Sequence, residues 1–432
     1  MDARTILILF SVFLVLETAV DIILTMLNLR HVQRHAGAVP SAFVGIVEDG
    51  QYRRSVEYTL TRGRFTLVVG SVSSAALLAI VASGLLGTLD TVARSLPIHP
   101  YLQGMVYIAT VSLGAWLLRL PFGLYSTFVI EGRFGFNRTT VRLFIVDALK
   151  GFAISVVIGV PVLAALFWFM DRTGRFWWLW AFAATTLFQF GMSYLAPTVI
   201  APMFNRFTPL PDGSLKDRIL ALARRLGFRT RGIYVVDSSR RSRHSNAYFT
   251  GLGRAKRIVL FDTLLATGSE DEIVAVLAHE IGHAKLKHVT KGMVVSMLFS
   301  LAGFWIISLL LSWQPLYQAF GFARPGYQDI LVLIAFCSGP FVYFLQPLLS
   351  MRSRRQEYHA DRFAVHGVGS AQGLRSALLR LSRENLSNLT PHPLYSFFHY
   401  SHPTLAERIS ALDRFEGELH PGPDAPSNSA TA

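Results

Sequence analysis

The chain has 432 residues, of which 52% are hydrophobic and only 16% are charged, and its mean hydropathy is +0.40. Soluble enzymes seldom reach this hydropathy, so the composition excludes an ordinary soluble enzyme and indicates an integral membrane protein. A net charge of +14 is also found in nucleic-acid-binding proteins, but here the basic residues fall into separate loops between apolar stretches, which argues against a nucleic-acid partner.

Seven apolar stretches are long enough to cross the roughly 30 Å hydrocarbon core of a bilayer. They lie at about 5–28, 65–88, 103–128, 149–170, 176–199, 292–312 and 330–349. The first contains Glu17 and Asp21 and is too long for a cleaved signal peptide. Cys337, the single cysteine, lies in the last stretch, so no internal disulfide can form. These features predict a multi-pass protein in a lipid bilayer.

The distribution of basic residues predicts the orientation of the chain in the membrane. Arginines crowd the loops after the first, third, fifth and seventh stretches, whereas the opposite side carries only Arg4, Arg94, Arg172, Arg175 and Arg324. By the positive-inside rule, the N-terminus lies outside and the C-terminus lies in the cytoplasm. The Arg- and Ala-rich composition favours a bacterial inner membrane over the eukaryotic endoplasmic reticulum.

Two polar segments, 200–291 and 350–418, lie on the same predicted cytoplasmic face, between and after the membrane segments 1–199 and 292–349. The first should contain an amphipathic helix and two short strands. The helix would turn one face inward, formed by Leu215, Ile219, Leu222 and Leu226, and the strands would cover Gly232–Val236 and Arg257–Phe261. The end of the chain, 419–432, is rich in Pro, Gly and Ser and is predicted to be disordered.

The run His279-Glu280-Ile281-Gly282-His283 carries the most specific chemistry of the chain. Residues four apart share one face of a helix, so His279 and His283 can hold one ion, and this H-E-x-x-H pattern is typical of zinc proteases. A zinc ion with an open position lowers the pKa of its water to about 7. Glu280 would act as the general base toward that water. Two ordinary helical histidines can share the spacing, so the motif needs a third ligand to support it.

The third ligand must come from elsewhere in the chain. The extended motif would place a glycine at Leu286 and a histidine at Val289, and His288 is one residue out of register. A carboxylate on a later helix is therefore expected, with Glu357 as the first candidate and Glu384 as the weaker one.

The sequence around Glu357 favours a helix that packs closely on another. Ala360 and Ala364 are small enough to permit such an approach. Asp361, one turn after Glu357, would accept the outer N–H of a ligand histidine, or would be a solvated acid.

Several further segments resemble the CAAX prenyl protease 1 family of integral-membrane zinc metalloproteases. The resemblance covers about Leu120 to Ile409. Besides the zinc helix it rests on Leu120–Glu131, Gly135–Thr139, Pro202–Asn205, Arg240–Phe249, Lys256–Thr263, Ser353–Asp361 and Ser401–Arg408.

The resemblance implies a role for each of seven residues. Its zinc ligands, one ion per chain, would be His279, His283 and Glu357, and the base would be Glu280. Asn246 would lie at a sheet edge that binds substrate backbone. His402 and Arg408 would steady the substrate carbonyl and the developing oxyanion. Without the resemblance, His402 would be interpreted as a turn residue before Pro403, and Arg408 as a solvated charge on a helix.

The implied fold is mainly α: a barrel of seven transmembrane helices around a hydrated chamber, capped on the cytoplasmic side by an α+β zinc protease domain. Glu17, Asp21 and Arg119 would line that chamber, or Arg119 would pair with one of the two acids.

The resemblance implies a peptidase that removes the last three residues after a prenylated cysteine. A broader quality-control protease for membrane proteins is the alternative, since no residue here encodes prenyl recognition. A non-enzymatic membrane scaffold would have lost Glu280, His402 or Arg408, and all three are present. An intramembrane protease of the site-2 type would carry its motif in an apolar span, but Asp271, Glu272, Lys285 and Lys287 flank this one.

Overall fold

The computed structural model describes residues 1–250 and 256–419, which form two compact units. The first, called the membrane unit, comprises Met1–Leu27, Thr61–Met192 and Met293–Gln346. The second, called the polar unit, comprises Asn28–Leu60, Ser193–Gly292 and Pro347–Ala432. The predicted disordered tail lies outside the described residues from position 420 onward.

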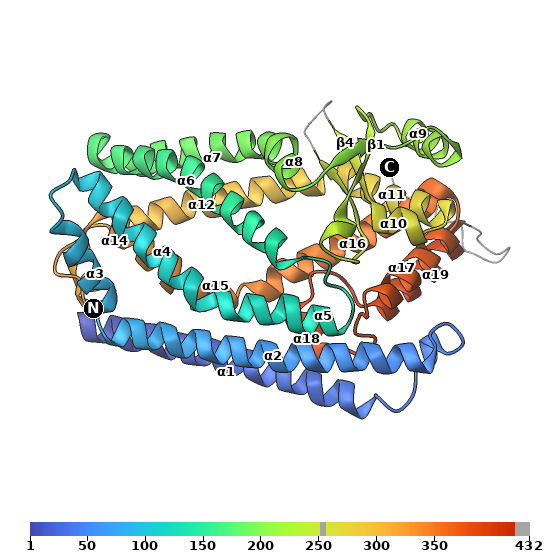
Figure 1. The fold of residues 1–432 in the computed structure, drawn as a ribbon, viewed down its shortest axis with the longest axis horizontal. Coiled ribbons are helices and arrows are strands. Elements are labelled where there is room, and N and C mark those ends of the chain that lie inside the picture. The colour runs from blue at the N-terminus through green and yellow to red at the C-terminus, as the bar shows by residue number, and fades with distance from the viewer. Residues whose placement is uncertain (251–255, 420–432) are drawn as a thin grey trace, which may run out of the picture. The chain divides into compact units, whose positions relative to one another are not determined.

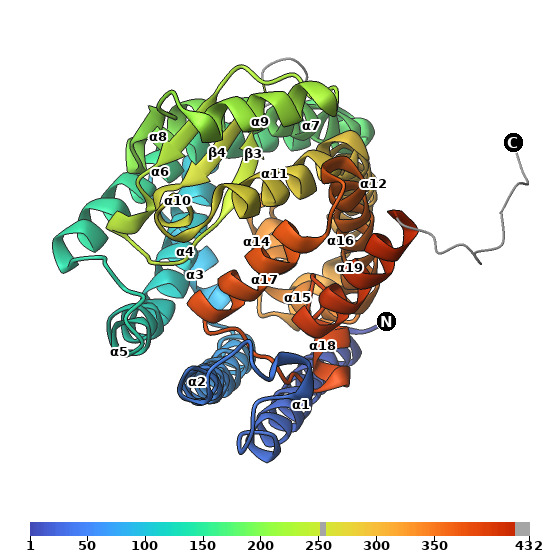
Figure 2. The ribbon, with the colours of Figure 1, turned by 90° about the vertical axis from the view of Figure 1, so that its right-hand side faces the viewer.

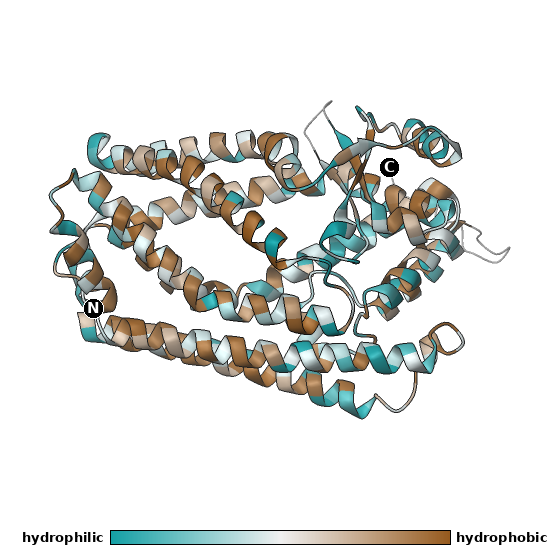
Figure 3. Ribbon diagram, in the orientation of Figure 1, coloured by the Kyte–Doolittle hydropathy of each residue, from teal (hydrophilic) through white to brown (hydrophobic). Residues whose placement is uncertain are grey.

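Within the described residues, six helical segments are long and apolar enough to cross a membrane. They are α1 (Ala3–Arg34), α2 (Asp49–Ala82), α4 (Pro100–Leu124) extended to Arg133, α6 (Val141–Arg172), α7 (Trp177–Leu195) extended through α8 (Ala201–Phe204), and α12 (His288–Leu310). Hydrophobic residues predominate along them (Figure 3). Large apolar side chains remain exposed on them, including Phe152, Val157 and Leu187, each with more than two thirds of its surface accessible. Such exposure is consistent with contact to lipid.

The prediction of a seventh span is not confirmed as a single helix. The stretch 330–349 is divided among α14 (Tyr327–Cys337), α15 (Gly339–Tyr343) and the start of α16 (Gln346–Val368). Pro340 and Pro347 each stand near the first position of a new helix. Proline has no backbone N–H and its ring clashes with the preceding turn, so an uninterrupted helix cannot pass through either position without a break or kink.

Short elements complete the connections. Two π-helical turns, η2 (Tyr125–Ile130) and η4 (Ala196–Ile200), continue α4 and α7. The other short elements are η1 (Ser41–Phe43), α5 (Glu131–Arg133), η3 (Gly174–Phe176), η5 (Ser238–Arg240), α10 (Asp262–Thr267) and α13 (Gln314–Ala319).

A buried ionic cluster joins α3 (Leu85–Arg94) to α14 in the membrane unit. The Arg94 guanidinium donates from Nε to Asp90 over 2.5 Å and from Nη2 to Asp329 over 2.6 Å. Gln328 donates to the other oxygen of Asp90 over 2.8 Å. Asp90 is 3% exposed and Asp329 is fully buried, so two buried carboxyl groups share the one guanidinium of Arg94. The cluster fixes α14 against the C-terminal end of α3.

The expected ion pair of Arg119 with an acid of the first span is absent from the described residues. Arg119 is exposed and pairs with neither Glu17 nor Asp21. Asp21 instead accepts a hydrogen bond from Tyr343 over 3.3 Å. The expectation of a hydrated chamber wall stays a prediction.

The polar unit contains a four-stranded mixed sheet. The strands are β1 (Phe207–Pro209), β2 (Ile233–Val236), β3 (Ala247–Thr250) and β4 (Arg257–Phe261), in the spatial order β1-β2-β4-β3. Strand β2 runs parallel to β4, and both outer pairs are antiparallel. The two strands predicted from sequence, at Gly232–Val236 and Arg257–Phe261, are confirmed as β2 and β4. Strand β3 forms one edge of the sheet.

Several helices complete the polar unit together with this sheet (Figures 1 and 2). They are α9 (Ser214–Arg225), α11 (Glu270–Lys285), α16, α17 (Gln372–Glu384), α18 (Pro393–His399) and α19 (Leu405–Leu419). The predicted amphipathic helix is confirmed as α9, whose Ile219 and Leu222 are buried in one apolar core with Leu260 of β4 and Leu277 of α11. The core therefore holds α11 against both the sheet and α9.

We expect Arg94→Leu to destabilise the membrane unit. Removing the guanidinium leaves Asp90 and Asp329 buried without a cation, and breaking a buried ion pair in this way costs about 3–5 kcal/mol. The thermal unfolding midpoint of the detergent-purified protein should fall by several degrees. The matched control is Arg175→Leu, because Arg175 is exposed and lies over the ring of Phe176. Equal losses in the two variants would contradict the prediction.

Candidate metal centre

Helix α11 carries the H-E-x-x-H motif, and its start is fixed by a capping box. The Ser269 hydroxyl accepts a hydrogen bond from the backbone N–H of Glu272, and the Glu272 carboxylate accepts one from the backbone N–H of Ser269. Glu272 also accepts hydrogen bonds from Ser376 and Arg380 of α17, the latter over 2.7 Å. Helix α11 is therefore anchored at its N-terminus before the chain reaches the histidines.

Three predicted ligands meet at one point of the polar unit. The Nε2 atoms of His279 and His283 are 3.1 Å apart. Glu357 of α16 places Oε2 3.5 Å from His279 Nε2 and Oε1 3.3 Å from His283 Nε2. A tetrahedral zinc ion with bonds of 2.0–2.1 Å separates its ligand atoms by about 3.3 Å. The donor set and its spacing thus fit zinc, and the group is the one His/Cys/Asp/Glu cluster of metal-binding geometry within the described residues.

Close packing of α11 on α16 brings Glu357 to the histidines. Gly282 faces Ala360, and a Cβ built on Gly282 would lie 3.2 Å from the Cα and carbonyl oxygen of Ala360. Ala360 is fully buried. Larger side chains at these two positions would separate the helices and with them the ligand atoms.

Asp361 is positioned to orient His279. Its Oδ1 lies 2.7 Å from His279 Nδ1, so Nδ1–H donates to the carboxylate and the lone pair of Nε2 faces the other ligands. The alternative reading of Asp361 as a solvated acid is wrong, because the side chain is fully buried.

His283 has an outer partner that sequence reasoning missed. Nδ1 of His288 lies 3.0 Å from Nδ1 of His283, and His288 is 6% exposed. Lys287 adopts a positive φ of 58° between α11 and α12, and this turn brings His288 back beside the motif. The only signal in the sequence was a third histidine shortly after the motif, out of register for a ligand.

Arg408 of α19 supplies a buried positive charge beside the ligands. Its Nε and Nη2 donate to both oxygens of Asp361, over 2.9 and 2.5 Å, in a bidentate pair. Its Nη1 lies 3.7 Å from Glu357 Oε2. Burial works against the charge of Arg408, but the carboxylates of Asp361, Glu357 and Glu280 outweigh it and raise the pKa. The guanidinium therefore keeps its charge inside the site.

The surroundings shift the pKa values of Glu357 and Glu280 in opposite directions. Burial would raise the pKa of Glu357, but the hydrogen bond from His283 and the neighbouring cationic side chains hold it at about 2. Glu357 is therefore ionised at neutral pH, as a metal ligand must be. Burial raises the pKa of Glu280 above its ordinary value, although His279 and His283 oppose the shift. A carboxylate of raised pKa is better suited to accept and return a proton.

Of the remaining predicted site residues, His402 lies beside the ligand group and Asn246 lies at the sheet edge. His402 is 63% exposed at its side chain, and its Nε2 lies 3.5 Å from Glu357 Oε1, so it borders the ligand group. Asn246 directly precedes the edge strand β3, where its carbonyl accepts a hydrogen bond from Phe261 of β4 over 3.1 Å. The weaker ligand candidate Glu384 bonds to Ser245 and Arg380 and is not part of the ligand group.

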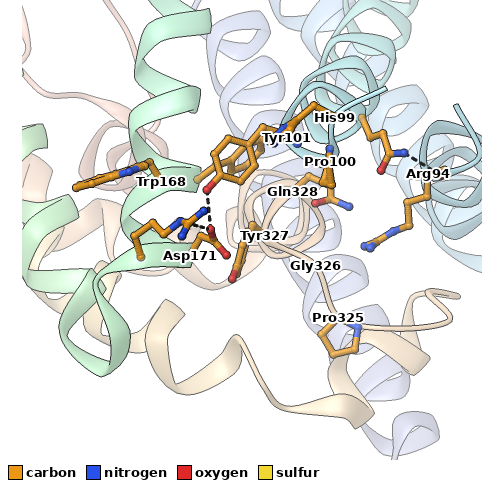
Figure 4. Close-up of a pocket in the computed structure, with 13 residues that line it drawn as sticks. Arg94, His99, Pro100, Tyr101, Trp168, Asp171, Pro325, Gly326, Tyr327 and Gln328 are labelled. Atoms are coloured by element: carbon orange, nitrogen blue, oxygen red, sulfur yellow. Dashed lines mark hydrogen bonds and ion pairs between the residues drawn. The ribbon is translucent and has the colours of Figure 1, made fainter. Parts of the chain in front are cut away.

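The candidate metal centre does not lie in the cavity of the membrane unit. A cavity of about 730 Å³ lies in the membrane unit, where Tyr101 donates a hydrogen bond to Asp171 over 2.9 Å and Arg172 pairs with the same carboxylate over 3.0 Å (Figure 4). Asp171 and His99 are its only carboxylate and imidazole. Two such donors are too few for a catalytic zinc site.

We expect Asp361→Asn to weaken metal binding roughly 10- to 100-fold, the usual cost of losing the partner of a ligand histidine. Competition with a chromogenic chelator would measure the affinity. Asp217→Asn, a change at an exposed acid of α9, is the control and should bind as the parent does. Parental affinity in the Asp361 variant would remove that residue from the site.

We further expect Gly282→Val to lower the metal content although no ligand is changed. The added side chain has no room against Ala360 and Phe363, so α16 must shift and carry Glu357 away. Gly292→Val is the control, because a Cβ there meets no atom within 4 Å. Full metal content, measured by elemental analysis, would show that the helix contact does not control the site.

Comparison with known proteins assigns the family. A family model described as "CAAX prenyl protease N-terminal, five membrane helices" matches residues 28–206, and one described as "Peptidase family M48" matches residues 209–416. The chain is 38% identical over 383 residues to a CAAX prenyl protease 1 homolog of Arabidopsis thaliana, covering 87% of this chain and 90% of that protein. It is 36% identical over 403 residues to CAAX prenyl protease 1 of Saccharomyces cerevisiae, covering 87% and 88%.

A solved structure shows the same fold. The crystal structure of S. mikatae Ste24p superimposes with a TM-score of 0.88 at 34% identity, covering 94% of this chain and 99% of that one. The relatives named here are from a plant and yeasts, and the predicted bacterial membrane is not confirmed by them. The matches and the metal-binding geometry together show that the chain belongs to the CAAX prenyl protease 1 family of membrane metallopeptidases.

Proposed function

We propose that this protein is a zinc endopeptidase that removes the C-terminal tripeptide following a prenylated cysteine. The observation that carries the proposal is the meeting of His279, His283 and Glu357 at spacings suited to one zinc ion, with Glu280 and Arg408 beside them. The names of the relatives support the choice of substrate, since they are CAAX prenyl proteases. The substrate is then a membrane-associated protein whose lipid lies in the bilayer.

The bound ion would supply a polarising charge for the substrate carbonyl and a water of lowered pKa. Glu280 accepts the proton of the attacking water and returns it to the leaving amine. Arg408 has its Nε and Nη2 fixed by Asp361, which leaves Nη1 on the side of Glu357. Together with His402, it offers donors to the oxyanion of the tetrahedral intermediate, an effect worth about 3–4 kcal/mol for one such donor.

Asn246 and the edge strand β3 would hold the peptide in an extended conformation. One side of β3 pairs with β4, so its other side can accept a further strand. Main-chain hydrogen bonds of this kind give affinity with little sequence preference. The polar unit would face the cytoplasm, in agreement with the distribution of arginines in the sequence.

The alternative proposal, a broad quality-control protease, uses the same site and differs only in substrate. The intramembrane type of protease is disfavoured because α11 is not among the membrane-spanning candidates and packs in the core of the polar unit. A non-enzymatic scaffold is disfavoured because it would have no need for the buried Asp361–Arg408 pair behind a ligand histidine.

Two variants separate the base from the ligand. Glu280→Gln should keep the metal and lose roughly 10²- to 10⁴-fold in turnover, because it cannot accept a proton. Glu357→Ala should lose metal as well as turnover. Glu48→Gln, at an exposed acid of the polar unit, should behave as the parent. Turnover retained by Glu280→Gln would refute its role as the base.

The substrate is tested with paired quenched-fluorescence peptides, one farnesylated near its C-terminus and one bare, in detergent. Chelator-sensitive cleavage with strong preference for the farnesylated peptide is expected. Equal cleavage of both would favour the quality-control alternative, and cleavage of neither by a metal-loaded enzyme would contradict the proposed substrate class.

A further inference from the structure

A second cavity, which lies in the polar unit, borders the candidate metal centre at His402. Its volume is about 370 Å³, and its lining includes His35 near the end of α1, Arg354 of α16 and Phe397 of α18. Leu389 and Pro391 contribute apolar side chains to the wall of the cavity. The cavity therefore combines a basic group with an apolar surface directly beside a residue proposed to contact the substrate carbonyl.

Arg354 is hydrogen-bonded to backbone carbonyls at the wall of this cavity. Its Nη1 donates to the carbonyls of Tyr400 over 2.6 Å and Phe397 over 3.1 Å, with a longer contact to Ser396 at 3.4 Å. The guanidinium also lies over the ring of Phe397, 5.4 Å from its centroid. None of these partners carries a negative charge, and no carboxylate of the described residues forms an ion pair with Arg354. A partly buried guanidinium without a counter-ion favours an anionic ligand.

Glu407 is the one acid in the lining, and its carboxylate is anchored at the start of α19 by neutral donors. Its Oε2 accepts hydrogen bonds from the backbone N–H of Thr404 over 2.7 Å and from the Thr404 hydroxyl over 2.9 Å, at the start of α19. His31 and His35 stack with ring centroids 4.2 Å apart, and they offer imidazole nitrogens but no permanent charge. Arg354 is thus the fixed cation of this cavity.

The size of the cavity suits the tripeptide that leaves after cleavage. A cavity of 370 Å³ is about 9 Å across if it is roughly spherical. Three extended residues reach at most about 10 Å. A tripeptide that starts at the carbonyl beside His402 can therefore place its C-terminal carboxylate at the wall formed by Arg354. Planar carboxylates and guanidinium groups form strong, often bidentate, hydrogen bonds.

We propose that Arg354 binds the C-terminal carboxylate of the substrate, so that the cavity takes up the departing tripeptide and the enzyme measures the distance from the chain end to the cleaved bond. This inference rests on the proposed function. It explains why cleavage occurs near a free C-terminus. Strand addition at β3 cannot explain this, because main-chain pairing is the same at any point of an extended chain.

The test compares two farnesylated peptides that differ only in ending with a free carboxylate or with an amide. The parent should show a kcat/KM for the acid that is roughly 10- to 100-fold higher than for the amide, the range expected for hydrogen bonds between charged groups. Arg354→Gln should bring this ratio close to one. Arg355→Gln, a change at the exposed neighbouring arginine, should retain the parental ratio.

The outcomes separate this inference from the proposed function. Equal cleavage of acid and amide by the parent would overturn the role of Arg354 and leave the protease intact. Cleavage of neither peptide would contradict the proposed function itself.

Because Arg354 also holds three carbonyls, its Gln variant can fail to fold, and product inhibition of the parent gives a second measurement. The free tripeptide should inhibit at a concentration at least about tenfold lower than the tripeptide amide. Equal inhibition by the two would overturn the inference.

Discussion

The contact between Gly282 of α11 and Ala360 of α16 is the constraint on which the candidate metal centre depends. The two histidines share one helix and need only its 3.6-residue period, whereas Glu357 lies 74 residues beyond His283 and reaches them only if the two helix axes come close together. Glycine and alanine permit this approach because they place almost no side-chain volume between the backbones. The capping box at Ser269 and the bonds from Glu272 to α17 then hold α11 in register.

Around this contact, each of the two candidate ligand histidines has a partner on its outer nitrogen. Asp361 fixes His279 and is itself held by Arg408, and His288 lies behind His283. The arrangement places two carboxylates and one guanidinium in a volume from which solvent is largely excluded, and their mutual pairing lowers the cost of burying them. The same Arg408 that neutralises Asp361 lies within 3.7 Å of a ligand oxygen, so the structural network and the proposed oxyanion site share one side chain.

The two units each contain a partly buried arginine, and the two guanidinium groups are bound by different kinds of acceptor. In the membrane unit, Arg94 is fully engaged by two buried carboxylates and joins helices. In the polar unit, Arg354 is held by neutral carbonyls and keeps its charge uncompensated by any described carboxylate. In the first arrangement the guanidinium has carboxylate partners within the protein, and in the second it has none among the described residues.

The sequence by itself determined what depends on local pattern. Composition and apolar runs predicted a membrane protein, helical spacing predicted the paired histidines, and β-branched runs predicted β2 and β4, because each signal lies within one element. Only the tertiary structure brought Glu357 rather than Glu384 to the two histidines, showed that Asp361 is buried, and brought His288 behind His283. It also divided the seventh apolar stretch at its prolines and placed Arg354 beside His402 in one cavity. These outcomes depend on which helices touch, and a one-dimensional pattern of residues does not encode distances between segments far apart in the chain.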